Sequence, residues 1–393
     1  MANYKRRKVR RSKHLYKARK SRFRKVVETF GFGAVVAALV FVGVVTAKTL
    51  FDYKPAPPVV TELPPASNIP HESTIIVTSD EPPLVEPPNS GFAADAVYAR
   101  SNVLTGSTAL RSYLKEEKSK GFKSVVIEMK DDEGRLLYKS EIEELSAFDE
   151  IVTGTLTAAQ IVEICLEEGL IPVARVNTLK DHIAPKKLQG IGFVNWLDNK
   201  PEEGGKRWSN PFLEGTVEYN ANIVRELSEA GFSDIVLANT IFPYFRGKDF
   251  TLLPEHETNP ATRFSALSDF INAVSDSLGE VGDSKVFLEM NLACFDGGNP
   301  AKTSEILKNN ADSLRVDGIL AVFNREFFDS FNSQEIIPTV EMVVEQGFSM
   351  MSRHSGSLEI IPLIDGTGIS EKDRDTIENA FISCGFENYT VRN

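Results

Sequence analysis

The sequence predicts an α/β protein whose main domain is a (β/α)8 TIM barrel, preceded by a single transmembrane helix and a Pro-rich stalk. The chain has 393 residues, 42% hydrophobic and 25% charged, which is typical of a folded protein. From Gly91 onward, short apolar runs alternate with longer amphipathic stretches. This alternation indicates parallel strands joined by helices, and eight strands in about 300 residues favour a closed barrel over an open doubly wound sheet. No Gly-rich phosphate-binding fingerprint opens a helix, which weakens the dinucleotide-binding alternative.

The N-terminal segment predicts a membrane anchor. Residues 1–25 hold 13 Lys or Arg and no Asp or Glu, so the other residues carry a net charge of −24 within a total of −11. An uncharged apolar run, Phe30–Ala47, follows and is just long enough to span a bilayer. Because basic residues beside a span stay on the cytoplasmic side, we expect a cytoplasmic tail at 1–29, an anchor at 30–50 and an extracytoplasmic remainder at the cell membrane.

Three alternatives for this segment are weaker. A buried core helix needs a polar stripe, which the run lacks. A signal peptide cleaved after Ala47 fits the small residues there, but the apolar run and the basic region before it are long for one. The basic tail could bind nucleic acid, but beside a membrane span it is better explained as a topology signal that also attracts anionic lipid. We therefore expect no nucleic-acid partner.

Residues 51–92 predict a disordered linker, because residues 55–90 contain ten of the 20 prolines. Proline lacks a backbone N–H and fixes φ, so this stretch cannot build a helix or a central strand. A ligand for Pro-binding modules is the alternative to an extended stalk. The barrel then occupies 93–393. We expect its strands at about 94–100, 124–130, 171–177, 234–240, 285–291, 318–324, 358–364 and 387–392. We expect its helices at 107–119, 157–168, 217–230, 262–278, 302–313, 334–346 and 370–382.

Side-chain parity on three strands selects the candidate site. Alternate strand residues point to opposite faces, and the chemistry of a (β/α)8 barrel lies at the carboxyl ends of its strands. The sets predicted to point inward are Val126, Glu128 and Lys130; Val173, Arg175 and Asn177; and Phe287, Glu289 and Asn291. Buried charges need partners, so these acids and bases form either a site for acid/base work or a structural ion network.

The loops contribute further candidates. Asp131 follows the second strand, and Lys180, Asp181 and His182 follow the third. No paired-His spacing supports a metal site, and three scattered cysteines support neither a disulfide framework nor a metal cluster, so we expect no metal and no cofactor. No Gly-x-Ser-x-Gly elbow presents a serine nucleophile. Trp196 and Trp208, with Tyr219 and Tyr244 nearby, form either a stacking surface for sugars or the packing of a long loop.

These residues resemble a family of glycoside-hydrolase-like domains of unknown function, which are (β/α)8 barrels of bacterial envelope proteins. The similarity runs from about Ala94 to Pro243. It is carried by residues 125–138, 172–185, 207–212, 218–235 and the Phe242-Pro243 pair. The resemblance implies an extracytoplasmic protein that acts on or binds a polysaccharide. It supports Glu128, where the family usually has Asp, and also Lys130, Asp131, Arg175, Lys180, Asp181, Trp208, Tyr219 and Asn220.

The fourth strand departs from the family pattern. Where the family has a strand-end Asp and then an Arg, this chain has Ala238 and Ile241, and Asn210 stands where the family prefers Asp. Glycoside hydrolysis ordinarily needs two carboxylates, so the loss of one leaves activity open. One hypothesis is an anchored glycosidase with Glu289 and either Asp131 or Glu128 as its carboxylates. Ligand contacts would then come from Lys130, Arg175, Lys180, Asp181, Trp208, Tyr219 and Asn291. The other is a catalytically inactive surface protein that binds glycan or organises the envelope.

Overall fold

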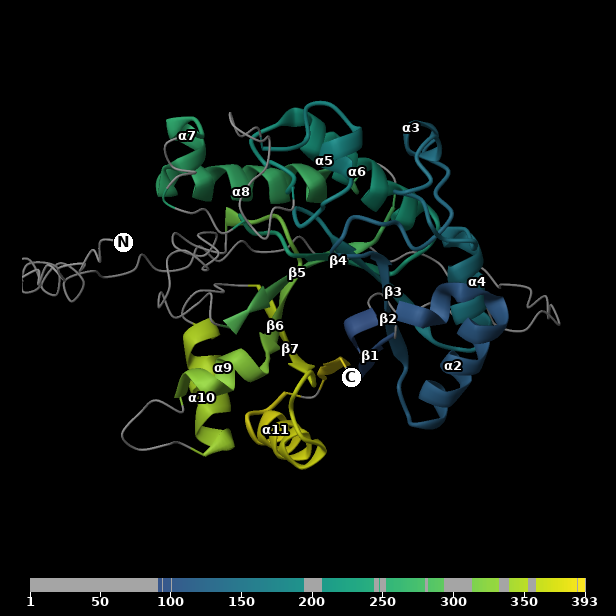
Figure 1. Cartoon of the computed structure of the whole chain (residues 1–393). Helices are drawn as coiled ribbons and strands as arrows, with labels where there is room; N and C mark the ends of the chain where they lie inside the picture. The colour runs from purple at the N-terminus through teal and green to yellow at the C-terminus, as the bar shows by residue number, and fades with distance from the viewer. Residues whose placement is uncertain are drawn as a thin grey trace, which may run out of the picture. The chain divides into compact units, whose positions relative to one another are not determined.

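The computed structural model describes residues 91–93, 95–99, 101–193, 207–243, 247, 252–279, 282–292, 313–331, 339–352, 358–386 and 388–392. In this part of the chain, eight parallel strands form a closed barrel in sequence order, with the last strand paired to the first (Figure 1). The strands are β1 (Ala96–Tyr98), β2 (Ser124–Lys130), β3 (Ile171–Asn177), β4 (Asp234–Ala238), β5 (Lys285–Asn291), β6 (Gly318–Phe323), β7 (Glu359–Asp365) and β8 (Thr390–Arg392). The predicted closed barrel is confirmed.

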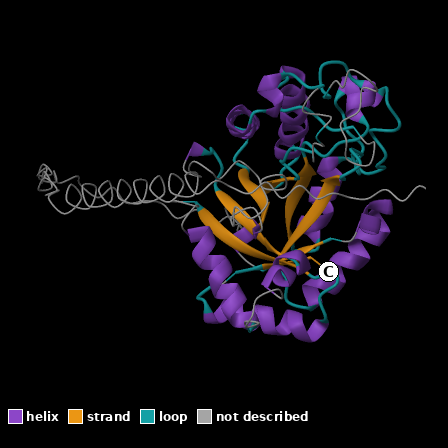
Figure 2. Cartoon of the chain, turned by 60° about the vertical axis from the view of Figure 1, so that its left-hand side comes forward, coloured by secondary structure: helices purple, strands orange, loops and turns teal. Residues whose placement is uncertain are grey.

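Helices lie outside the ring of strands (Figure 2). They are α2 (Ser107–Ser119), α3 (Glu143–Ser146), α4 (Ala158–Glu167), α5 (Ala184–Lys187), α6 (Glu214–Glu229), α7 (Glu255–Thr258), α8 (Pro260–Asp276), α9 (Arg325–Phe331), α10 (Val340–Ser352) and α11 (Glu371–Ser383), with 3-10 turns at Gly91–Ala93 and Ser101–Thr105. Side-chain caps mark where several of these helices begin. For example, the Thr157 side chain accepts from Gln160 N while the Gln160 side chain accepts from Thr157 N, a capping box at the start of α4.

Helices in the C-terminal half of the chain differ in part from the prediction. The helix expected at 334–346 is α10, which begins only after Pro338, because a proline inside a helix removes a hydrogen bond and clashes with the preceding turn. Thr339 Oγ1 accepts from Met342 N at this start. The helix α9 was not predicted, although Asn324 Oδ1 caps it by accepting from Phe327 N. The helix expected at 302–313 lies almost wholly outside the described residues.

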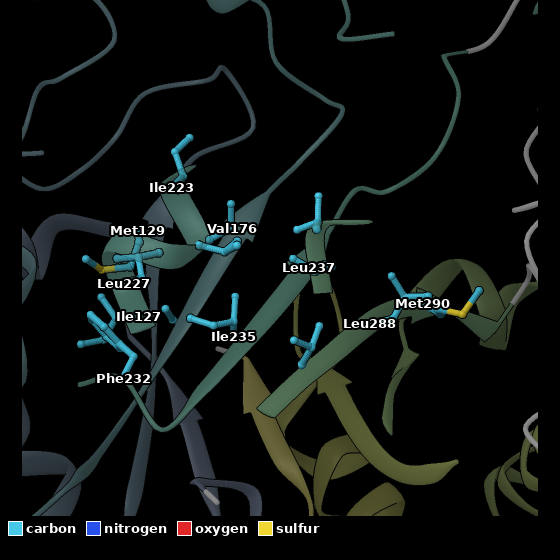
Figure 3. Close-up of a cluster of buried hydrophobic side chains, with 14 of the residues drawn as sticks. Ile127, Met129, Val176, Ile223, Leu227, Phe232, Ile235, Leu237, Leu288 and Met290 are labelled. Atoms are coloured by element: carbon cyan, nitrogen blue, oxygen red, sulfur yellow. The ribbon is translucent and has the colours of Figure 1, made fainter. Parts of the chain in front are cut away.

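The parity prediction separates two apolar layers. Ile127, Met129, Leu288 and Met290 belong to the outer apolar cluster, in which Ile127 and Met129 lie beside Leu227 of α6 (Figure 3). A second, smaller cluster fills the barrel interior and includes Val126, Val173 and Phe287, three of the residues predicted to point inward. Its members are Phe92, Ala96, Tyr98, Val126, Val173, Val236, Phe287, Leu320, Val322, Ile361 and Leu363. The interior is therefore a packed core below the strand ends, and the polar residues lie above it.

The barrel includes two residues that the sequence analysis assigned to the linker. Gly91 N donates to Asp234 Oδ2 at 2.5 Å, and Phe92 is buried against Phe287 with ring centroids 4.8 Å apart. An apolar residue directly before the predicted start of the barrel at residue 93 thus fills the barrel interior. No helix in the described ranges is long and apolar enough to cross a membrane. The predicted anchor at 30–50 and the rest of the linker lie outside those ranges.

Gly134, in the loop after β2, provides a test of the packing at the carboxyl ends of the strands. Its φ is +99°, and a Cβ added there would lie 2.1 Å from Asp181 Oδ1. We expect Gly134→Ala to lower the free energy of unfolding by about 3 kcal/mol or more, because backbone strain adds to a clash with a buried carboxylate. Gly190→Ala is the matched control, since Gly190 has φ +74° with nothing within 4 Å of an added Cβ, and it should cost only about 1–2 kcal/mol. If urea denaturation showed equal losses of unfolding free energy for the two variants, the added Cβ at residue 134 would not clash with Asp181.

Candidate active site

An ion network lies where the strands end. Arg175 of β3 donates from Nη1 to Glu128 Oε1 of β2 at 2.6 Å. From its other edge it donates to both oxygens of Glu289 of β5, through Nε at 2.7 Å and Nη2 at 2.9 Å. Three of the predicted residues thus meet as expected, and one guanidinium joins the two carboxylates. Because both bind the same planar group, their oxygens lie within the roughly 10 Å that a two-carboxylate mechanism requires.

Three further residues of this network were missed by the sequence analysis. Tyr98, at the end of β1, donates through its hydroxyl to Glu289 Oε2 at 3.0 Å. Arg392, at the end of β8, donates from Nη2 to the same oxygen at 2.7 Å and forms an ion pair with Asp365 at 3.4 Å. The Arg392 guanidinium also lies 4.4 Å from the centroid of the Tyr98 ring. Only Arg392 ends a strand at the predicted position, since the strands expected at 94–100 and 358–364 end at Tyr98 and Asp365 in the structure. The parity argument was applied only to β2, β3 and β5.

The surroundings of the two glutamates push their pKa values in opposite directions. Burial alone would raise the pKa of Glu289, but the charges and hydrogen bonds of Arg175 and Arg392 outweigh it and hold that pKa far below the usual carboxyl range. Burial raises the pKa of Glu128, and the opposing effects of Arg175 and Asn177 do not cancel it. Glu289 is therefore ionised at neutral pH, while Glu128 is the carboxyl that holds a proton more readily.

Glu128 is also the more accessible carboxylate. Its side chain is 27% exposed, against 10% for Glu289. Within the described part of the chain, the two hydrogen bonds that Glu128 accepts both end on Oε1, from Arg175 and from Asn177 Nδ2 at 3.0 Å. Glu289 accepts four, from Tyr98, Arg392 and twice from Arg175. The geometry therefore presents Glu128 to a ligand and keeps Glu289 in the wall of the site.

Lys130 does not join this network, contrary to the parity prediction. The pairing of β2 with β3 shifts register between Glu128 and Lys130, and such a bulge turns the following side chain to the other face. Lys130 is fully buried, with Nζ 2.8 Å from Asp181 Oδ2 and 4.8 Å from the centroid of the Tyr219 ring. Tyr219 also donates to Asp181 Oδ2 at 3.2 Å. Lys130, Asp181 and Tyr219, which were predicted to bind the ligand, thus form an ionic cluster that is buried from solvent.

The remaining predicted residues support the loops. Asp131 Oδ1 accepts from the backbone N–H groups of Glu133 and Arg135, and its other oxygen pairs with the Arg135 side chain, so its role here is to fold the loop after β2. Lys180 forms an ion pair with Asp132 at 2.6 Å and joins this loop to the next one. Asn291 is half-buried at the end of β5, on the same side of the strand as Glu289.

Trp208 packs the long loop between β3 and β4. It is only 1% exposed, and its ring meets that of His182 edge-on at 6.1 Å, so it presents no face to a sugar. Trp196 and Tyr244 lie outside the described residues. No group of three or more His, Cys, Asp or Glu side chains in the described ranges could hold a metal ion. The candidate site is thus the network of Tyr98, Glu128, Arg175, Asn177, Glu289, Asp365 and Arg392.

A family match covers most of the strands that carry this network. Residues 96–291 match a family model described as "Putative glycosyl hydrolase domain", and the matched segment runs from β1 to the end of β5. This part of the chain belongs to that family. Among curated proteins, none matches the chain. The matched segment therefore contains Tyr98, Glu128, Arg175 and Glu289, while Arg392 comes from the part of the barrel beyond the match.

Distant similarities to solved structures also exist. A hypothetical protein from Ruminiclostridium thermocellum ATCC 27405 is 16% identical, with 48% of this chain and 96% of that one covered and a TM-score of 0.40. The catalytic domain of a beta-amylase from Paenibacillus polymyxa is 9% identical, with 76% and 91% covered and a TM-score of 0.48. A GH20 beta-N-acetylhexosaminidase from Streptomyces coelicolor A3(2) is 10% identical, with 68% and 47% covered and a TM-score of 0.39. At these values the similarities assign no role to any residue.

The fourth strand ends beside this network. Ala238 is the last residue of β4 and is fully buried, and its carbonyl oxygen accepts from Thr178 N at 2.9 Å. Beside the network, β4 thus ends in a methyl group instead of a carboxylate. Among the described strands, the carboxylates of the network come from β2, β5 and β7.

The ionisation of Glu289 predicts a pH-dependent contribution to stability. Glu289→Gln leaves Arg175 and Arg392 without their shared counter-charge, and we expect it to lower the free energy of unfolding at pH 7 by about 3 kcal/mol. Because the pKa is lowered on folding, the contribution of the ionised Glu289 is fully present above the ordinary value of 4.5 and is lost as pH falls below it. Urea denaturation at pH 7, 5, 4 and 3 should show the gap between wild type and variant narrowing below about 4.5. A difference in unfolding free energy that does not change with pH would contradict the ionised state assigned to Glu289.

Proposed function

We propose that the barrel acts on a polysaccharide of the cell envelope, binding it over the ion network and hydrolysing a glycosidic bond. The observation that carries the proposal is the pair Glu128 and Glu289, which are held by one guanidinium and whose pKa values are shifted in opposite directions. Glycosidases use two carboxyl groups, one that donates a proton and one that is ionised. Glu128 suits the first role and Glu289 the second.

In this mechanism Glu128 protonates the glycosidic oxygen as its bond to the anomeric carbon breaks. Water then adds to that carbon and gives a proton back to the Glu128 carboxylate, which restores the acid. The positive charge that develops on the sugar ring is stabilised electrostatically by Glu289, whose own charge is fixed by two arginines. Because four donors occupy the oxygens of Glu289, an electrostatic role fits it better than direct attack on the sugar. Arg175 keeps both carboxylates in place.

A second candidate is a domain that binds glycan without cleaving it. Two observations favour it: β4 ends in Ala238, and Glu289 accepts four hydrogen bonds from neighbouring side chains where Glu128 accepts two from the described residues. A polar surface of this kind could still hold the hydroxyl groups of a sugar through hydrogen bonds. The two candidates share a ligand and differ only in whether the bond is broken.

The proposed location rests on the N-terminal sequence. The basic tail at 1–29 and the apolar run at 30–50 would hold the protein in the cell membrane, and the Pro-rich segment would carry the barrel toward the envelope polysaccharide. A cysteine-accessibility assay on intact cells tests this part separately. In a background with the three native cysteines replaced by serine, labelling of a cysteine introduced near residue 60, but not near residue 5, by a membrane-impermeant reagent is the expected result.

The activity is tested on the full chain in detergent micelles with purified envelope polysaccharides. New reducing ends and binding are measured in parallel for the wild type, Glu128→Gln and Glu359→Gln. Glu359 is the matched control, because it is exposed and begins β7 at the opposite end of the barrel. Reducing ends that depend on Glu128 but not on Glu359 support hydrolysis. Binding without reducing ends supports the second candidate, and neither signal with any envelope polysaccharide overturns the proposal.

A further inference from the structure

Asn239 follows β4 directly and has an unusual backbone conformation. Its φ is +49°, and it is the one non-glycine residue with positive φ in the described part of the chain. L-residues pay a steric cost in this left-handed region, and asparagine pays less than most. The conformation brings the side chain toward the end of β3, where Asn239 Nδ2 donates to Asn177 Oδ1. A strained residue beside a candidate site calls for an explanation at that site.

Asn177 connects this contact to Glu128. Its Nδ2 donates to Glu128 Oε1 at 3.0 Å and to the main-chain oxygen of Lys130 at 2.8 Å. Both of these atoms accept hydrogen bonds when Glu128 is ionised, so the amide nitrogen has to face them and Oδ1 has to face away. Asn177 is fully buried, which means that Oδ1 needs a donor within the protein. The Asn239 amide supplies it.

We propose that Asn239 is a positioning residue that fixes the orientation of the Asn177 amide and thereby the hydrogen bond to Glu128. Without the Asn239 donor, the buried Oδ1 loses its partner, and the amide no longer has a single preferred orientation. An inverted amide would place an oxygen against Glu128 Oε1 and disfavour the ionised form. Any effect on turnover rests on the proposed function, whereas the effect on Glu128 does not require a substrate.

Other charged groups around Glu128 also shift its pKa. Arg175 of β3 and Arg392 of β8 favour its ionised form, and Asp131 in the loop after β2 disfavours it. None of them contacts Asn239 through a hydrogen bond or ion pair of the described residues, so a substitution at 239 leaves them in place. A change in the titration of Glu128 would therefore report on the amide of Asn177.

The test measures the titration of Glu128 by NMR in the full chain, labelled at the glutamate side-chain carboxyl carbon, in detergent micelles without substrate. Glu128→Gln identifies the signal. Asn239→Gly removes the amide but keeps the left-handed backbone accessible, and it should shift the pKa of Glu128 upward. Asn177→Ala should shift it upward as well, and combining the two should add nothing to the Asn177→Ala shift, because Asn239 acts only through Asn177.

An unchanged titration in Asn239→Gly overturns the proposal, and so do additive shifts in the double variant. If Asn177→Ala fails to fold, Asn239→Gly alone still decides. A barrel that cleaves no polysaccharide but shows the expected shifts would refute the proposed hydrolysis while supporting the role of Asn239. A barrel that cleaves polysaccharide without those shifts would do the reverse.

Discussion

Replacing Glu128 by glutamine is expected to lower the rate of polysaccharide hydrolysis by about 10²–10⁴-fold while leaving binding nearly unchanged. Glutamine keeps the shape of the side chain, and its oxygen can still accept from Arg175 and Asn177. It cannot transfer a proton to the leaving oxygen. The measurement is the rate of reducing-end formation at saturating polysaccharide, with binding of the same polysaccharide determined independently.

The proton-transfer role is separated from a general disturbance by the leaving group and by pH. An aryl glycoside with an acidic phenol needs little protonation, so the Glu128→Gln loss should be much smaller for it than for the polysaccharide. In the wild type, burial raises the pKa of Glu128, and activity should fall as pH rises through that value because the acid must be protonated. This alkaline fall should disappear in the variant. An equal loss with both substrates, or an unaltered pH profile, would exclude Glu128 as the acid.

The fold was predictable because segments with the two-residue period of strands alternate along the chain with segments that have a helical period. Runs such as 124–130 alternate between residues for the interior and residues for the helical layer, and helices with clear caps separate them. The inward set Val126, Val173 and Phe287 follows from parity alone, because a strand with a period of two leaves no other choice once one face is known. The meeting of Glu128, Arg175 and Glu289 follows from the same rule.

The rest of the site depends on features without a sequence signature. A register shift between Glu128 and Lys130 moves Lys130 out of the network, and parity counting assumes that no such bulge occurs. The left-handed backbone of Asn239 is one of several conformations open to an asparagine.

The buried pair of Lys130 and Asp181 predicts the largest loss of stability in the barrel. Both side chains are fully buried, with 2.8 Å between Lys130 Nζ and Asp181 Oδ2. Lys130→Met leaves the carboxylate with the backbone N–H groups of Ile183 and Ala184 and the Tyr219 hydroxyl, but without a counter-charge. Removing one partner of a buried pair typically costs about 3–5 kcal/mol, and we expect urea denaturation to show a loss of that size.

Lys180→Met is the matched control, because it makes the same substitution in an ion pair that is exposed. Lys180 and Asp132 are 2.6 Å apart, with side chains 31% and 51% exposed, and such pairs contribute less than about 1 kcal/mol. The double variant Lys130→Met/Asp181→Asn should be more stable than the sum of its single losses predicts, since the second substitution removes the charge that the first left unpaired. Additive losses, or a Lys130→Met loss no larger than that of Lys180→Met, would show that the buried cluster is not held together by its charges. The loops after β2 and β3 would then owe their positions to packing around Tyr219.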